Sequence, residues 1–378
     1  MMRFEFATAA RIVFGAGSVS EVAPAARALG SRPFLVTGCD RGELARAGLE
    51  GAIFLVRGEP AVGLVREGVR AAIAEKAGVI VAIGGGSAID AGKAIAGLLR
   101  NGPEPLDYLE VVGRGQPLAN PAAPFIAVPT TAGTGAEVTR NAVLASPEHR
   151  VKASLRSPYL LPRLAVVDPQ LTLSLPPAIT ASTGLDALTQ LLEAWVSVRA
   201  NPMTDAYCRE GLPLVARSLR RAFRDGTDLA ARTDMSLAAL LSGLALANGG
   251  LGAVHGFAAP IGGMFDAPHG AVCAALLPHA TAVNIAALRS RDPGGDRLRR
   301  YEAAARALTG NGAASAHELP QWLNELCRDL GIPGLASYGA GDEHIADFVA
   351  QAARSSSMKG NPIVLTEAEL REILARAF

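Results

Sequence analysis

Short apolar runs alternate with helical patterns through the first half of the chain, and this alternation constrains the fold more than any other feature. The apolar runs are bounded by turn residues, which predicts strands at 12–17, 34–37, 53–56, 79–83, 125–128 and 165–167. Helical spacing of apolar residues predicts helices between them, at 19–29, 62–76 and 88–99. Strands that alternate with helices form a doubly wound parallel sheet, whose ligands bind at the carboxyl ends of the strands. We therefore expect an N-terminal α/β domain.

After Pro176 the strand signals disappear, and only helical patterns follow. These patterns predict helices at 178–198, 203–221, 228–247, 273–288, 297–308, 315–330 and 343–354. A chain of 378 residues also exceeds what one hydrophobic core usually supports. We therefore expect two domains, an α/β domain over residues 1–176 and an all-helical domain over residues 177–378.

The net charge, the apolar segments and the cysteines indicate which binding partners and which cellular compartment to expect. The formal net charge is +1, from 36 Lys+Arg against 35 Asp+Glu, so no strong field favours a nucleic acid. The segment 235–265 carries no charged residue, but Asn248, Gly249, Gly250 and Pro260 interrupt it, which favours a buried helix pair over a membrane span. Four cysteines without CxxC pairing and an N-terminus without a signal-peptide pattern predict a cytoplasmic protein with reduced thiols.

A glycine-rich turn forms the first candidate site. The run Gly84, Gly85, Gly86 and Ser87 joins a predicted strand directly to a predicted helix. Glycines let the backbone approach a ligand, Ser87 is expected to cap the helix, and the first amides of a helix attract anions. The spacing is neither G-x-G-x-x-G nor the P-loop pattern. A diphosphate would fit this turn, and a tight turn without a ligand is the alternative.

The second candidate site starts from an acid on an apolar helical pattern. Asp186 and Gln190 are four residues apart and so share one helix face. A buried, ionised carboxylate needs a metal, a cation or hydrogen-bond donors, because leaving it unpaired costs several kcal/mol. His255 and His269 complete one acid and two imidazoles, which is the ligand inventory of an open divalent-metal site. On their own, His255 would be a buried structural histidine and Glu193 an ion-pair partner on its helix.

Five motifs taken together resemble the iron-containing, or group III, alcohol dehydrogenase family. In chain order they are GGGSAIDAGK (84–93), PTTAGTGAEVT (129–139), DPQLTLSLPP (168–177), STGLDALTQLLEAW (182–195) and VHGFAAPIGGMFDAPHG (254–270). The resemblance covers nearly the whole chain. It implies an NAD- or NADP-dependent oxidoreductase that interconverts an alcohol and an aldehyde or ketone by metal-assisted hydride transfer. It also implies a small-molecule substrate, and a homodimer or larger homo-oligomer with no nucleic-acid or membrane partner.

The resemblance carries the family's site residues onto this chain one by one. The residues that match the cofactor site are Gly84, Gly85, Gly86 and Ser87 at the diphosphate, Thr130, Thr131 and Thr134 near the adenosine and nicotinamide ends, and Lys152 close to the cofactor. Those that match the catalytic metal site, for iron or zinc, are Asp186, His255 and His269.

Two positions depart from the family pattern. Gln190 stands where the common sequence DALTH has a histidine, and a carboxamide oxygen is a weaker ligand for iron or zinc than an imidazole. We therefore treat Gln190 as a possible fourth metal ligand or as a hydrogen-bond partner of the substrate. Ala259 replaces a histidine that lies near the nicotinamide in some members, so it cannot relay a proton. Related glycerol-dehydrogenase-like enzymes resemble this chain in placing only one Asp and two His on zinc.

The choice between NAD and NADP depends on the residues after the second predicted strand. An acid there would bond the adenosine ribose and repel a 2′-phosphate. Gly38 removes that repulsion and Arg41 could pair with a phosphate, whereas Asp40 could restore a preference for NAD. Both cofactors are therefore compatible with the sequence.

Three alternatives remain open at this point. Gln190 allows a metal-independent reductase that resembles maleylacetate reductases, although Asp186 is retained. A lyase that resembles dehydroquinate synthase would share the fold, but its site is crowded with Lys and Arg, unlike the apolar segment 255–269. A catalytically inactive binding protein is the third.

Overall fold

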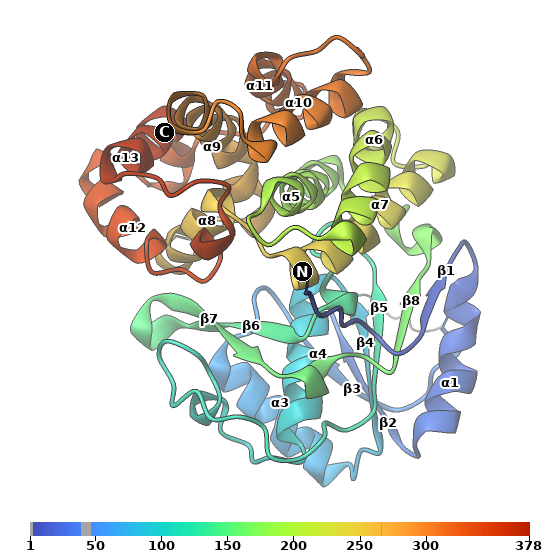
Figure 1. Ribbon diagram of the computed structural model, residues 1–378. Helices are drawn as coiled ribbons and strands as arrows, with labels where there is room; N and C mark the ends of the chain where they lie inside the picture. The colour runs from blue at the N-terminus through green and yellow to red at the C-terminus, as the bar shows by residue number, and fades with distance from the viewer. Residues whose placement is uncertain (1–2, 39–46, 266) are drawn as a thin grey trace. The chain divides into compact units, whose positions relative to one another are not determined.

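The computed structural model describes residues 3–38, 47–265 and 267–378, which form two compact units (Figure 1). One unit is Ala7–Ser174, and the other is Leu175–Phe378 joined by the described residues before Ala7. The first unit contains a parallel sheet with helices, and the second is helical. The predicted fold class is therefore confirmed.

A six-stranded parallel sheet forms the centre of the α/β unit. Its strands lie in the order β1 (Ile12–Phe14), β8 (Leu164–Val167), β5 (Phe125–Pro129), β4 (Val79–Gly84), β2 (Pro33–Thr37) and β3 (Ala52–Leu55). Every residue of β4 and β5 is buried, as expected for central strands covered on both faces. Because β2, β4 and β5 are neighbours, the loops that follow them meet at one edge of the sheet.

Helices cover both faces of this sheet. Alternate residues of β2 point to opposite sides, so that Phe34 packs in one hydrophobic cluster and Leu35 in the other. The cluster around Phe34 includes residues of α3 (Val62–Ala74) and α4 (Gly86–Leu98), and the other includes residues of α1 (Val22–Leu29). This three-layer arrangement is the doubly wound architecture that the sequence predicts.

An antiparallel hairpin in the same unit is absent from the sequence prediction. Its strands are β6 (Asn141–Ser146) and β7 (Val151–Arg156), with Asn141 opposite Arg156. Only alternate positions of β6 are buried, and two of its buried residues, Ala142 and Leu144, join the cluster around Phe34. The strand was missed because its alternating buried residues, Ala142, Leu144 and Ser146, are not among the types that favour strands.

The helical unit is arranged around α5. Its helices are α5 (Pro177–Val196), α6 (Pro202–Arg224), α7 (Leu229–Gly249), α8 (Ala253–Met264), α9 (His269–Arg291), α10 (Asp296–Thr309), α11 (Leu319–Asp329), α12 (Ile345–Ala352) and α13 (Glu367–Ala377). Most residues of α5 are buried, and it packs against α6, α7 and α9 (Figure 1). The helix α13 is absent from the sequence prediction, and α9 begins at His269 instead of Cys273.

Two of these helices, α7 and α9, are long and apolar enough to cross a membrane by length and composition. However, 67% and 78% of their most apolar windows are buried inside the structure, so most of this apolar surface packs against other parts of the protein. The charge-free segment 235–265 divides into the end of α7 and the whole of α8. The predicted buried helix pair is therefore confirmed.

Candidate active site

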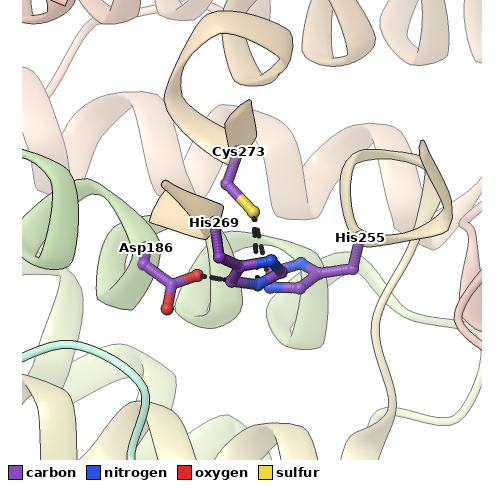
Figure 2. Close-up of side chains that lie close together, drawn as sticks. All are labelled: Asp186, His255, His269 and Cys273. Atoms are coloured by element: carbon purple, nitrogen blue, oxygen red, sulfur yellow. Dashed lines mark hydrogen bonds and ion pairs between the residues drawn. The ribbon is translucent and has the colours of Figure 1, made fainter. Parts of the chain in front are cut away.

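Three helices of the helical unit bring four potential metal donors together (Figure 2). Asp186 lies on α5, His255 on α8, and His269 is the first residue of α9. Cys273 follows one turn later on α9, on the same face as His269. One ligand atom from each of the four side chains lies within 4.8 Å of the others. The structure thus gathers the three residues predicted as ligands and adds a thiol that the sequence prediction missed.

Four distances between these atoms are close to those between the ligands of one tetrahedral ion. Asp186 Oδ1 lies 3.4 Å from His255 Nε2 and 3.8 Å from His269 Nε2. Cys273 Sγ lies 3.8 Å and 3.7 Å from the same two nitrogens. Tetrahedral zinc, with bonds of about 2.1 Å to N or O and about 2.3 Å to S, separates its donors by about 3.4–3.6 Å. The donor set therefore fits a divalent cation with only small adjustments.

One carboxylate oxygen at the centre of the cluster makes no hydrogen bond. Asp186 is 2% exposed, and its Oδ1 is among the few buried side-chain atoms of the described residues without a hydrogen-bond partner. Burial alone would raise the pKa of Asp186, but contact with His255 and the charge of His269 lower the pKa overall. The side chain is therefore an ionised carboxylate with one oxygen available to a cation.

Cys273 differs electrostatically from the other cysteines that the structure describes. Burial raises the pKa of Cys327 to about 12 and raises the pKa of Cys208 as well. Burial acts in the same direction on Cys273, but the charges of His269 and His255 outweigh it and lower its pKa. Cys273 therefore forms a thiolate, the form that binds metals, more readily than the other two.

Gln190 lies beside the cluster and not within it. Its Nε2 donates a hydrogen bond to Asp186 Oδ2 at 3.0 Å, and its Oε1 accepts one from Ser242 Oγ at 2.7 Å. An ionised carboxylate can only accept hydrogen bonds, so the amide nitrogen must face Asp186 and the oxygen must face Ser242. Both polar atoms of the Gln190 amide are thus hydrogen-bonded within the protein, one to Asp186 and the other to Ser242.

Glu193 positions His255 in a similar way. Its Oε2 lies 2.7 Å from His255 Nδ1, and its Oε1 accepts a hydrogen bond from the Val254 amide at 2.7 Å. A proton on Nδ1 that points at this carboxylate leaves Nε2 with its lone pair toward the donor cluster. The sequence predicted that Glu193 would pair with a residue of its own helix, but its carboxylate contacts Val254 and His255 of α8. The sequence did carry a signal for these contacts, because Asp186, Gln190 and Glu193 follow one another at about one turn along α5 and so share one helix face.

We expect Glu193→Gln to weaken zinc binding by about tenfold to a hundredfold, since carboxylates that orient a metal-bound histidine typically contribute this much. Competition with a chromophoric chelator measures the affinity. Glu302→Gln on the exposed side of α10 is the matched control, because Glu302 pairs only weakly with Arg306, at 3.8 Å. Unchanged zinc affinity in Glu193→Gln would show that this carboxylate does not orient His255 for a metal.

The predicted diphosphate turn lies at the carboxyl end of β4. Gly84 ends that strand with φ +157°, and the Thr130 amide, just after β5, donates a hydrogen bond to its carbonyl at 3.0 Å. A Cβ on Gly85 would lie 3.2 Å from Thr131 Cγ2, and one on Gly86 would lie 2.8 Å from Thr134 Cγ2. The predicted glycines and threonines are thus side by side. A side chain at position 86 would collide with Thr134.

The start of α4 differs from the predicted cap. Gly85 is the N-cap residue and α4 begins at Gly86, so Ser87 lies within the first turn and does not cap the helix. No side chain accepts a hydrogen bond at the cap. The first amides of α4 are therefore suited to an external anion.

The remaining predicted cofactor residues lie on other elements of this unit. Gly38 is exposed directly after β2, the strand next to β4. Lys152 lies on β7, where its Nζ is 2.5 Å from Glu59 Oε1. Asp40 and Arg41, on which the choice between NAD and NADP depends, lie outside the described residues.

Comparisons with known proteins match both parts of the chain. A sequence profile of the iron-containing alcohol dehydrogenases matches residues 9–169, and one of the C-terminal domain of the Fe-containing alcohol dehydrogenase family matches residues 180–378. The chain is 37% identical to 1,3-propanediol dehydrogenase of Klebsiella pneumoniae over 338 residues, covering 89% of this chain and 85% of the relative. It is 33% identical to NAD-dependent methanol dehydrogenase of Bacillus methanolicus over 384 residues, 97% of each chain. A crystal structure of 1,3-propanediol oxidoreductase superposes with a TM-score of 0.90 at 34% identity over all of both chains.

Proposed function

The chain belongs to the iron-containing alcohol dehydrogenase family, and from this premise we propose that it transfers hydride between a small alcohol or carbonyl compound and NAD or NADP with the help of a divalent metal. It is an alcohol dehydrogenase-like oxidoreductase. The observation that carries the metal-dependent mechanism is the buried Oδ1 of Asp186, which has no hydrogen bond and faces two imidazole nitrogens.

Asp186, His255 and His269 are the proposed catalytic residues and would hold the metal through one oxygen and two nitrogens. A divalent ion bound there would supply Lewis acidity worth several kcal/mol toward a substrate oxygen. The other side chains keep the donors in place, since Gln190 holds the second oxygen of Asp186 and Glu193 holds the far nitrogen of His255. This support is what a preorganised metal site requires.

The proposed cofactor site is the sheet edge where the loops after β2, β4 and β5 meet. The amides of Gly86 and Ser87 at the start of α4 would bind the diphosphate, because a helix N-terminus stabilises negative charge. Gly84 and Gly85 leave the space that this requires. Thr130, Thr131, Thr134, Gly38 and Lys152 complete the proposed set.

A metal-independent reductase is the main competing function. In that case the buried Asp186 carboxylate would keep one hydrogen bond, from Gln190, and one oxygen that only the two imidazole rings approach. Together with a carboxylate oxygen of Asp186, the donors at 255, 269 and 273 lie within 4.8 Å of one another, a set of ligand atoms that a cation would use in full. The metal-dependent enzyme is therefore the function that the site supports best.

We further place the enzyme in the cytoplasm as a homodimer or larger homo-oligomer, with a small molecule as its substrate. Its described cysteines at 208, 273 and 327 are free thiols, which suits a reducing compartment.

Oxidation of NADH and NADPH with a panel of short aldehydes and oxoacids tests this function. We expect turnover of at least one carbonyl compound, its loss after removal of the metal by a chelator, and its return on adding zinc or iron. Full activity in protein shown to contain no metal would contradict the proposal and favour the metal-independent reductase. No NAD(P)H oxidation with any compound would instead favour an inactive binding protein.

A further inference from the structure

We propose that Cys273 is a fourth metal donor in this site and that its thiolate makes the site prefer zinc over iron. The inference rests on the proposed function, because it requires a metal at Asp186, His255 and His269. It adds a sulfur ligand to the three donors predicted from the sequence, and it assigns the metal.

The position of the sulfur supports this role. Figure 2 shows Sγ of Cys273 directed at the two imidazole rings, and its distances to their Nε2 atoms are nearly equal, at 3.8 Å and 3.7 Å. A thiol proton can point at only one of these nitrogens, so the second contact is a hydrogen bond only when the other ring carries a proton on Nε2 and donates it to the sulfur. A cation at the centre of the cluster would use all three atoms.

A second observation, independent of the cysteine, points to the same place. Asp186 is 2% exposed, and its unbonded Oδ1 faces the same two Nε2 atoms from α5. The cluster therefore presents one oxygen, two nitrogens and one sulfur from three separate helices. These are four protein donors within 4.8 Å of one another, the number that a tetrahedral ion takes, while Ser242 holds the oxygen of Gln190.

The helix geometry explains why Cys273 can act with His269. The two residues are four positions apart on α9, which places both side chains on one face of the helix, one turn apart. The other described cysteines have different surroundings, since Cys327 Sγ contacts the Ala274 carbonyl at 3.4 Å. Neither Cys208 nor Cys327 belongs to the donor cluster.

Charge and ligand softness then favour zinc. A carboxylate, a thiolate and two neutral imidazoles sum to two negative charges, which balance a divalent ion once the thiol proton has passed to solvent. Between zinc and ferrous iron, a thiolate ligand favours zinc more than oxygen and nitrogen donors alone do. The protein should therefore hold zinc more tightly than a site limited to Asp186, His255 and His269.

Cobalt substitution tests the sulfur ligand directly. Co(II) bound to the wild-type protein should show the intense near-ultraviolet charge-transfer absorption of a thiolate–cobalt bond, and Cys273→Ser should lack it. We also expect Cys273→Ser to lose about tenfold or more in zinc affinity and to lower the zinc-to-iron affinity ratio by a similar factor. Cys327→Ser, a buried cysteine outside the cluster, should keep both the absorption and the affinities.

The outcomes separate this inference from the proposed function. Cobalt that binds the wild type without a thiolate band would overturn the role of Cys273 and leave a three-ligand metal site intact. A wild-type protein that binds neither cobalt nor zinc would overturn the metal-dependent function itself. If Cys273→Ser does not fold, the test still stands. A thiolate–cobalt band that is present in both the wild type and Cys327→Ser would support Cys273 as the ligand, and its absence from the wild type would overturn that role.

Discussion

Asp186→Ala should purify as a folded protein without bound metal and lose about a thousandfold or more in kcat/KM. The ion that this carboxylate holds is expected to supply several kcal/mol of transition-state stabilisation, and each 1.36 kcal/mol corresponds to about a factor of ten in rate. Metal analysis of the purified variant and steady-state NAD(P)H oxidation measure the two effects.

Asp186→Asn is the matched control for this prediction, because asparagine keeps the shape of the side chain. Its amide oxygen can accept the hydrogen bond that Gln190 Nε2 donates to Asp186 Oδ2. Only the charge is removed, so a similar loss in both variants would assign the effect to the missing anion. Thermal melting of both proteins checks that the helical unit stays folded. Wild-type turnover in Asp186→Ala would remove this residue from the mechanism.

Gly86→Ala should weaken NADH or NADPH binding by about tenfold or more. The added methyl group would lie 2.8 Å from Thr134 Cγ2, closer than side-chain carbon atoms approach one another. The loop after β5 would have to move from the start of α4, at a cost of about 1–3 kcal/mol for overpacking. Fluorescence titration of the reduced cofactor gives the dissociation constant.

Gly63→Ala provides the control for the glycine substitution. Gly63 lies in the first turn of α3, and an added Cβ there would meet no atom within 4 Å. It should leave cofactor affinity unchanged and slightly raise stability, because alanine favours the helix. Equal cofactor affinity in Gly86→Ala and wild type would place the diphosphate elsewhere.

The fold could be predicted because its strongest signals are local. Central parallel strands such as β4 and β5 are buried on both faces and so appear as unbroken apolar runs. The hairpin of β6 and β7 is buried only at alternate positions of β6, and its position depends on packing that a single sequence does not reveal. The cap at Ser87 was wrong by two positions, since α4 already begins at Gly86.

The candidate site could be predicted only as a set of residue types. Asp186, His255 and His269 stood out because an acid on an apolar helix requires partners and the family frame supplies them. Which atoms face one another depends on how α5, α8 and α9 pack. For that reason the roles of Gln190 and Cys273 emerged only from the contacts.

The most direct test of the account is anomalous diffraction from a crystal of the protein loaded with zinc. We predict one strong peak bonded to Asp186 Oδ1, His255 Nε2 and His269 Nε2 at about 2.0–2.2 Å. A peak at another position, or none at these three residues in a preparation that still oxidises NAD(P)H, would contradict the account.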